Sequence, residues 1–281
     1  KLPQGTPQSK GKAMINLLPL SEGENITTIM PLPENEQEWE NLYIMFTTEK
    51  GNVRKNKLSD FVDVRANGKI AMKLQDNDEI KTVETCMDHD DLLITTLKGQ
   101  CIRFRVSDVR LFVGRSSTGV RGIRLAQGDK VISSAIIKSM NATTEERAAY
   151  LKMSRAVRGD IESDNAENEE STENITPAIL SDEKYAEMGA SEQFILSISN
   201  NGYGKRTSTF EYRVTGRGGK GIIAMVVNDR NGNIADSFPV DSANQIILVT
   251  NNGKLIRCPV DDIRIASRST QGVKIFDVDD Q

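Results

Sequence analysis

The sequence repeats itself about every 50 residues, and this repeat restricts the fold more than any other feature. Each copy of the first repeated unit is an apolar run, a turn that contains glycine, and a second run. The four copies are LYIMFTTEKGNVRK (42–55), LLITTLKGQCIR (92–103), FILSISNNGYGKR (194–206) and IILVTNNGKLIR (246–257). The turn glycines are 48, 103 and 51 residues apart, and the residue four positions later is basic in each copy: Lys55, Arg103, Arg206 and Arg257.

A second unit, here called the glycine–base segment, follows each of these hairpins and occurs once before the first of them. It contains a base, small or polar residues, glycine, another base and then alternating apolar residues. Segments 1 to 5 are QSKGKAMINL (8–17), VRANGKIAMKL (64–74), RSSTGVRGIRL (115–125), VTGRGGKGIIAMV (214–226) and RSTQGVKIFDV (268–278). Units this small cannot bury a core alone, so we expect them to stack side by side.

The repeats predict an all-β fold. Their apolar runs are short and β-branched, and asparagine–glycine turns such as 251–253 favour tight hairpins. About four strands in each repeat is typical of propeller blades, so we expect a propeller-like array of four-stranded blades, about five in number. We expect one domain over 1–281.

Helix signals occur only in an insertion at 140–193, which holds 13 acids and 5 bases. Thr143 and Glu146 form a capping-box pattern before 147–157, which ends at Gly159. A second short helix is expected at 182–188, and the acidic stretch 160–176 is expected to be disordered.

The chain carries 36 bases and 40 acids, but outside the insertion the balance is 31 bases to 27 acids. A mildly basic body with one acidic block is typical of a polyanion-binding module. An acidic block that is only solvated is an equally open interpretation.

Several classes of function are not favoured by the composition. No stretch approaches the ~20 apolar residues of a membrane span, so no membrane association is expected. Three distant cysteines and a single histidine, His89, argue against a disulfide framework, a metal site and two-histidine catalysis, and favour the cytoplasm. We expect no catalytic residue, metal or cofactor in this chain. Because it opens on Lys1, we expect a segment of a longer protein.

Segment 4 contains the sharpest motif, in which Gly216, Gly218 and Gly221 satisfy G-x-G-x-x-G. A dinucleotide site needs a following helix, but 222–227 is strand-like, and a P-loop needs Ser or Thr after Lys220. Two interpretations remain: a glycine-rich bend with solvated bases, or a phosphate site in which Arg217 and Lys220 supply charge. The base beside glycine in all five segments favours the phosphate site.

A row of such sites along a curved rim fits a bent duplex better than a small molecule. Bending 20–30 base pairs costs on the order of 1–6 kcal/mol, so many contacts are needed. With only 5% aromatic residues, sequence-specific or single-strand readout is not favoured. We expect Lys12, Lys69, Arg121, Lys220 and Lys274 along one side of the rim. The candidate contacts to double-stranded DNA are Lys10, Lys12, Lys55, Arg65, Lys69, Arg103, Arg115, Arg121, Arg124, Arg206, Arg217, Gly218, Gly219, Lys220, Gly221, Arg257, Arg268 and Lys274.

The chain resembles the family of C-terminal domains from the A subunit of bacterial DNA gyrase. The resemblance rests on NLLPL (16–20), NGKIAMKL (67–74), TGVRGIRLAQGDKV (118–131), NNGYGKRT (200–207) and STQGVKI (269–275). It implies a six-bladed β-pinwheel whose blades exchange strands, with about five blades in this chain. It also implies that DNA wraps around the rim with a right-handed crossing, so that negative supercoils can be introduced.

The resemblance further implies a place in a larger assembly. The parent enzyme would be an ATP-hydrolysing type II topoisomerase of the nucleoid. The partners would be the rest of the A subunit, plus the ATPase B subunit, in an A2B2 complex. This segment would be noncatalytic, because no tyrosine lies in a setting like that of the DNA-cleaving tyrosine. The family's box, Q-R-R-G-G-K/R-G, lies in the first blade, and its role of initiating or closing the wrap is carried onto 217–221.

Two alternatives stay open. One is the equivalent domain of topoisomerase IV, which has fewer blades; the blade count and the Gly-Gly-Lys-Gly at 218–221 favour gyrase. The other is a propeller for protein–protein recognition, whose central face rather than its rim would carry the function.

Overall fold

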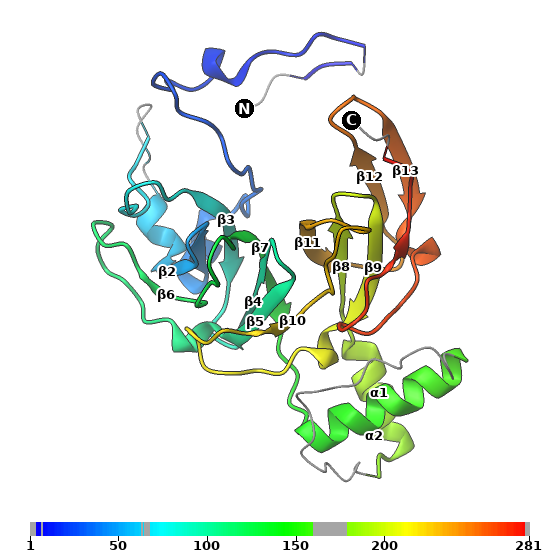
Figure 1. Cartoon of the computed structure of the whole chain (residues 1–281). Helices are drawn as coiled ribbons and strands as arrows, with labels where there is room; N and C mark the ends of the chain where they lie inside the picture. Colours follow the sequence, from blue (N-terminus) through cyan, green and yellow to red (C-terminus); the bar gives the residue numbers. More distant parts are fainter. Residues whose placement is uncertain (1–3, 7, 63, 65–67, 160–178, 279–281) are drawn as a thin grey trace.

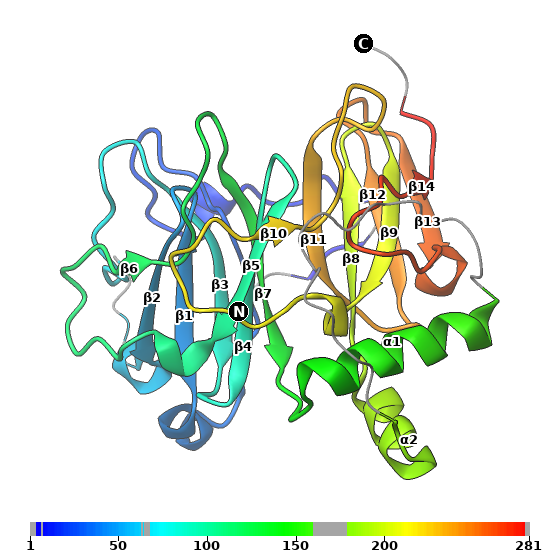
Figure 2. The same cartoon turned by 60° about the horizontal axis from the view of Figure 1, so that its bottom comes forward.

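Antiparallel sheets stand side by side in an arc in the computed structural model, which describes residues 4–6, 8–62, 64, 68–159 and 179–278 (Figures 1 and 2). The strands are β1 (Tyr43–Thr48), β2 (Asn52–Lys57), β3 (Ile80–Cys86), β4 (Asp90–Thr96), β5 (Gln100–Arg105), β6 (Val120–Arg121), β7 (Val131–Lys138), β8 (Phe194–Ser199), β9 (Tyr203–Ser208), β10 (Ile222–Ile223), β11 (Ile234–Val240), β12 (Gln245–Val249), β13 (Leu255–Pro259) and β14 (Val273–Lys274). The sheets are β3-β1-β2-β6, β10-β5-β4-β7, β11-β8-β9-β14 and β12-β13. The four predicted hairpins are confirmed as β1–β2, β4–β5, β8–β9 and β12–β13.

One strand of each four-stranded sheet comes from the next repeat along the chain. β6 in segment 3 pairs with β2, β10 in segment 4 with β5, and β14 in segment 5 with β9. The residue directly after each turn glycine is a pairing partner: Asn52 with Arg121, Gln100 with Ile223, and Tyr203 with Lys274. The strand exchange implied by the resemblance is therefore present in these three sheets.

The exchanged strands form the outer edge of the arc. At the opposite edge of the sheets, β3 contacts β7 and β7 contacts β11, so these strands line the inner side. The exchanged strand crosses so close to the hairpin that a Cβ on Gly202, which has φ of 78°, would overlap the carbonyl oxygen of Phe276. Glycine is required at this turn by both the crossing and the backbone conformation.

The apolar core lies between neighbouring sheets rather than within one sheet. Met45 and Val53 of the first hairpin share a buried cluster with Leu92 and Phe104 of the second. Similar clusters join the second hairpin to the third and the third to the fourth. This arrangement is the one expected of units that are too small to bury their own apolar faces.

The insertion forms two helices, α1 (Thr144–Arg158) and α2 (Asp182–Ser191). The predicted capping box is confirmed: the Glu146 amide donates to Thr143 Oγ1 (3.2 Å), and the Thr143 amide donates to the Glu146 carboxylate (2.8 Å). The second helix continues past the predicted end, to Ser191. The predicted disorder at 160–176 lies outside the described residues.

Both helices pack against the third sheet's hairpin region. Tyr150 of α1 meets the ring of Phe210 edge-on, with 5.2 Å between ring centroids, and lies 5.1 Å from Tyr185 of α2. Met188 completes this buried cluster. Neither described helix is long and apolar enough to cross a membrane.

The described residues form fewer complete four-stranded blades than the five or so that the repeats predict. Within the described residues there are three four-stranded sheets and one hairpin, and segments 1 and 2 contribute no strand. The pairing rule explains this difference, since each segment pairs with the hairpin of the preceding repeat and no described hairpin precedes β1–β2. The chain before residue 42 instead runs across the open side of the arc, from the first sheet towards β12–β13 (Figure 1).

Candidate nucleic-acid interface

The recurring hairpin base is buried in three of its four copies. Lys55, Arg103 and Arg206 are 4%, 5% and 5% exposed. Each one donates to a backbone carbonyl in the 3₁₀ turn of the following repeat: Lys55 to Val106 O (3.1 Å), Arg103 to Thr209 O (2.7 Å) and Arg206 to Asp261 O (3.0 Å). These bases therefore connect one blade to the next.

Carboxylates already neutralise the same three bases. Lys55 pairs with Asp88 (2.6 Å), Arg103 with Asp91 (2.7 Å) and Arg206 with Asp261 (3.3 Å). Burial lowers the pKa of Arg103, and the Asp91 carboxylate opposes that shift. This burial argues against the predicted DNA contacts at Lys55, Arg103 and Arg206, because their charged ends lie inside the joints between blades. Arg257, the fourth copy, is exposed and has no described hydrogen-bond or carboxylate partner.

Two further buried bases were missed by the sequence reasoning. Arg54 donates to Ser117 O (2.7 Å), and Lys205 donates to the carbonyls of Ser267 (2.6 Å) and Arg268 (2.7 Å). Both hold the beginning of a glycine–base segment of the following repeat, segment 3 for Arg54 and segment 5 for Lys205. Adjacent pairs of bases, such as Lys205 and Arg206, could have indicated these buried positions. Neighbouring residues on a strand point to opposite faces, and both faces of a stacked sheet are buried.

The glycine–base segments are joined end to end along the outer edge. The amide of Lys73 donates to Ser117 O (3.2 Å), that of Arg124 to Gly219 O (2.8 Å), and that of Val226 to Thr270 O (3.1 Å). The three bonds are equivalent to one another. In each, an amide near the end of one segment donates to a carbonyl at an earlier position of the next segment. We call the described residues 68–74, 115–125, 214–226 and 268–278 the rim belt.

Four exposed bases gather where segments 3 and 4 meet. Gly218 N donates to Gly122 O (2.6 Å), and the Arg217 guanidinium donates to the carbonyls of Arg121 (3.1 Å) and Asp108 (3.1 Å). No carboxylate of the described residues pairs with any of the four, which we call the rim patch: Arg121, Arg124, Arg217 and Lys220. Together they present four positive charges on rigidly connected backbone.

Not all glycines of segment 4 are available to bind an anion through their backbone amides. Gly221, with φ of 82°, is required because a Cβ there would overlap the carbonyl oxygen of Cys101, where the exchanged strand crosses. Gly218 directs its amide inward to Gly122. Gly219 and Lys220 are exposed, and their amides have no acceptor in the described part of the chain, so these two remain able to bind an anion.

The other candidates lie in varied settings. Lys10 and Lys12 are exposed in the N-terminal segment. Lys69 and Arg115 are half-buried and donate to Asp60 O at 2.8 Å and 3.4 Å. Arg268 is half-buried on Ile223 O (2.9 Å), and Lys274 pairs with Asp277. Arg65 lies outside the described residues.

The candidate bases do not form the regular row that was expected. Arg121 and Lys274 occupy equivalent pairing positions, but the corresponding residue of segment 4 is Ile223. Lys220 lies three positions earlier, and Lys69 is held by carbonyl groups. The basic surface is thus concentrated between the first and second sheets rather than distributed evenly.

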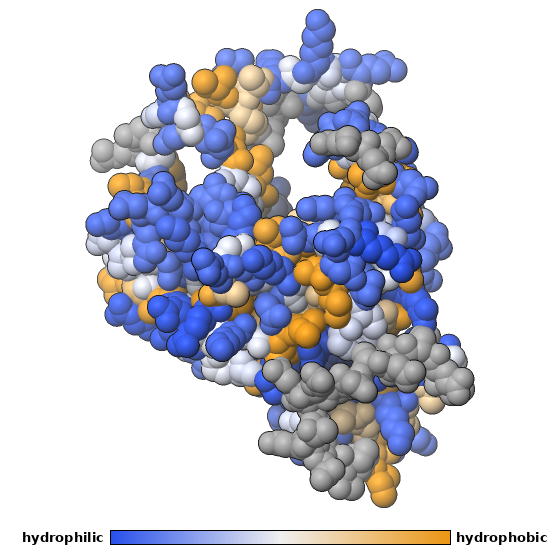
Figure 3. All heavy atoms as spheres, in the orientation of Figure 1, coloured by the Kyte–Doolittle hydropathy of each residue, from blue (hydrophilic) through white to orange (hydrophobic). Residues whose placement is uncertain are grey.

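Hydrophilic side chains cover most of the visible face over the first and second sheets, whereas apolar side chains gather near the middle of the view (Figure 3). Within the described residues, no group of histidine, cysteine, aspartate and glutamate side chains could hold a metal ion.

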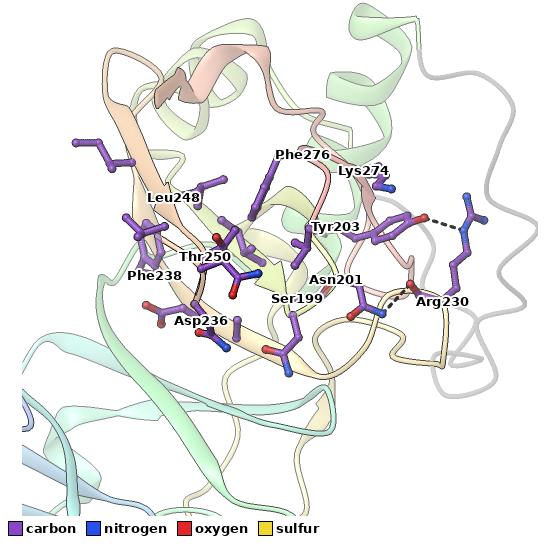
Figure 4. A pocket seen from close by; sticks show the side chains of 18 residues that line it. Ser199, Asn201, Tyr203, Arg230, Asp236, Phe238, Leu248, Thr250, Lys274 and Phe276 are labelled. Atoms are coloured by element: carbon purple, nitrogen blue, oxygen red, sulfur yellow. Dashed lines mark hydrogen bonds between the residues drawn. The ribbon is translucent and has the colours of Figure 1, made fainter. Parts of the chain in front are cut away.

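A pocket of about 740 Å³ lies between the third sheet and β12 (Figure 4). Tyr203 accepts a hydrogen bond from Arg230 (3.1 Å), and burial raises the pKa of Asp236. The side-chain amide of Asn201 donates hydrogen bonds to the Asp229 and Arg230 carbonyls of the neighbouring loop. The side chains that line this pocket mainly support the turn and do not form an acid–base or nucleophilic group.

A family model for the DNA gyrase C-terminal domain, a beta-propeller, matches residues 42–87, 90–138, 193–241 and 244–281. The four matched stretches begin close to the four hairpins, so each corresponds to one repeat.

This chain also matches part of the sequence of several curated proteins. The DNA gyrase A subunit of Rickettsia bellii is 46% identical over 280 residues, covering 100% of this chain and 30% of that protein. The DNA gyrase A subunit of Escherichia coli is 34% identical, covering 97% of this chain and 25% of that protein. The chain therefore spans under a third of the length of these relatives.

Solved structures share the fold. A DNA gyrase A C-terminal domain superposes with a TM-score of 0.69 at 20% identity, covering 97% of this chain and 73% of that one. The C-terminal domain of a DNA topoisomerase IV gives 0.68 at 19% identity, covering 95% and 66%. The fold alone does not separate the two, whereas the family model, which matches more than half of the chain, names gyrase. This chain, with its exchanged strands and its hairpins joined by buried bases, belongs to the DNA gyrase C-terminal domain family.

Proposed function

We propose that this chain binds the sugar–phosphate backbone of double-stranded DNA and bends the duplex around the rim belt. The observation that carries the proposal is the rim patch, four exposed bases without carboxylate partners on one connected strip of backbone. Arginine and lysine in such a setting bind phosphates, and they position a duplex without reading its sequence. The exposed Arg257, Lys10 and Lys12 are additional contacts in this proposal.

The relatives support a role within a larger enzyme. By the likeness to the gyrase chains, this segment would wrap DNA so that a type II topoisomerase introduces negative supercoils. The partners would be the rest of the A subunit, plus an ATP-hydrolysing B subunit. The six-bladed array, the right-handed wrap and the place of action in the nucleoid belong to the same proposal. Sequence identity favours gyrase over topoisomerase IV.

Salt dependence tests the contact with phosphate. Four phosphates neutralised by the rim patch contribute about −3.6 to the log–log salt slope, and this share alone lowers the affinity about 150-fold between 50 mM and 200 mM salt. The double variant R217A/K220A removes two contacts, so the magnitude of its slope is expected to fall by about 1.8, with the same loss on unrelated duplex sequences. A slope that stays near the original value, or a loss that depends on sequence, would refute the proposal.

Ligation of a nicked circle in the presence of the chain tests wrapping. Chiral wrapping changes the linking number of the closed product, whereas simple binding leaves it unchanged. A linking number that does not shift at saturating protein would limit the function of this chain to binding without wrapping.

A further inference from the structure

The loop that leads into β6 is one residue longer than the equivalent loops of the later repeats. Each loop begins at a residue that forms a parallel bridge with the recurring hairpin base: Leu111, Val214 and Ile265. Each ends at a glycine where a Cβ would clash with a carbonyl oxygen of the hairpin that it crosses: Gly119, Gly221 and Gly272. The glycine follows the bridged residue by eight positions in the first loop and by seven in the other two.

The belt bonds narrow the place of the extra residue. Their acceptors are the carbonyls of Ser117, Gly219 and Thr270. The acceptor follows the bridged residue by six positions in the first loop and by five in the other two. The extra residue therefore lies within 112–116.

Both ends of this stretch are fixed to the first hairpin. The carbonyl of Phe112 accepts a hydrogen bond from the Asn56 side chain (2.7 Å), and the carbonyl of Ser117 accepts one from Arg54 Nη1 (2.7 Å). Residues 113–116, which we call the segment 3 loop, are left to project between these anchors. Figure 2 shows the chain between β5 and β6 projecting beside β6, at the outer edge of the first sheet.

The segment 3 loop presents one apolar side chain among small residues. Val113 is 92% exposed, whereas Phe112 before it is buried against the hairpin. The neighbours of Val113 in the loop include Gly114 and Ser116, which are small and exposed, and a Cβ on Gly114 would meet no atom within 4 Å. A valine on so narrow a projection fits the minor groove of DNA, which is about 6 Å wide.

Positive charges surround the exposed valine. The guanidinium groups of Arg110 and Arg54 lie over the Phe112 ring, 4.2 Å and 4.7 Å from its centroid, and Arg115 donates to Asp60 O (3.4 Å). Among the residues that the structure describes, no carboxylate forms an ion pair with Arg54, Arg110 or Arg115. Burial lowers the pKa of Arg54, and the charges of Arg110 and Arg115 lower it further. The three groups thus form one positive field around the loop.

The segment 3 loop lies beside the rim patch. Arg217 of the patch donates to the carbonyl of Asp108 (3.1 Å), which is two residues before Arg110. A duplex bound at the rim patch therefore passes the loop.

We propose that Val113 enters the minor groove of the bound duplex and kinks it there, while Arg110 and Arg115 bind the phosphates on either side. Apolar side chains inserted in this way partly unstack one base step and bend the duplex by about 20–90° towards the major groove. The inference rests on the proposed function, because the ligand is the same duplex. It adds the place at which the bend is concentrated.

The test compares two matched variants of the whole chain, V113S and V157S. Val157, on α1, is 77% exposed and lies outside the rim belt, so both variants should keep the thermal midpoint of the original chain. Each protein binds two 20-base-pair duplexes, one fully paired and one with a central T·T mismatch, and fluorescence anisotropy measures the affinities. Unstacking costs a few kcal/mol at a paired step and less at a mismatch.

The original chain and V157S are expected to bind the mismatched duplex about tenfold more tightly, and V113S to bind both duplexes about equally. The salt slope of V113S should match that of the original chain, because no phosphate contact is lost. Permanganate oxidation of unstacked thymines in the paired duplex gives a direct readout, and it should be enhanced by the original chain and not by V113S. In R110Q, the magnitude of the salt slope should fall by about 0.9.

The failure of the wedge differs from the failure of the proposed function. A preference for the mismatch that V113S retains in full overturns the wedge, since smooth bending alone then explains it, and the proposed function stands. An unchanged salt slope in R110Q overturns the phosphate contact beside the valine. Absence of salt-dependent duplex binding by the original chain overturns the proposed function and the wedge together.

Discussion

Replacing Arg103 with methionine distinguishes a joint between blades from a DNA contact. Methionine keeps an unbranched apolar stem and removes the guanidinium group, so Asp91, which is 0% exposed, keeps only the half-exposed Arg105 at 3.3 Å. Removing one partner of a buried ion pair costs about 3–5 kcal/mol, because the other charge stays buried. Thr209 O and Tyr212 O also lose the hydrogen bonds that Arg103 donates.

Arg257→Met is the matched control, since Arg257 is the same repeat position in an exposed setting. We expect its free energy of unfolding to change by no more than about 0.5 kcal/mol. Urea unfolding followed by circular dichroism measures both variants. Adding Asp91→Asn to R103M is expected to recover part of the loss, because no buried charge then remains.

Duplex binding supplies the second readout. R103M is expected to keep the salt slope of the original chain under conditions where both are folded. A stable R103M chain whose slope falls by about 0.9, the value for one lost phosphate, would refute the assignment of this arginine to the blade joint.

Three other predictions concern the exchanged strand, the pH dependence and the thiols. Gly221→Ala is expected to lower the thermal midpoint far more than Gly253→Ala, because both glycines have positive φ but only Gly221 faces a close carbonyl, that of Cys101; equal losses would contradict the close crossing. Burial raises the pKa of Glu84 to about 6, so its contribution to stability is fully present below the unfolded value of 4.5 and is lost as pH rises through about 6. Glu84→Gln should therefore flatten the fall in unfolding free energy over this range, and an unaltered pH profile would count against it. Burial raises the pKa of Cys86 and Cys101 to about 12, so the native chain should react with a thiol reagent at Cys258 first, as mass spectrometry of the labelled peptides would show.

Regular spacing made the hairpins and the stacking of repeats predictable. The turns at Gly51, Gly99, Gly202 and Gly253 all join paired strands, because alternation and turn chemistry act over a few neighbouring residues. The capping box at Thr143 was predictable for the same reason. The hairpins and the capping box depend on residues close together in the sequence, and stacking follows because units this small cannot bury a core alone.

The predicted site depended on longer-range contacts and was only partly predictable. Lys55, Arg103 and Arg206 recur as regularly as a binding motif would, but their periodicity reflects the joint between blades. The sequence shows that a base is needed once in each repeat, and it does not show whether a carbonyl or a phosphate is its partner. The clustering of Arg121, Arg124, Arg217 and Lys220 joins residues nearly 100 positions apart.

The order of residues by itself determined a repeating β architecture, an acidic helical insertion and a basic body. Only the tertiary structure decided which bases face water, since that depends on how the exchanged strand of one repeat lies on the hairpin of the previous one. Periodicity is a local property of the chain, whereas the exposure of a charge is set by the neighbours that folding brings to it. Arg103 is an example: the 3₁₀ turn of the neighbouring blade, packed beside it, accepts its hydrogen bond and makes it a structural residue.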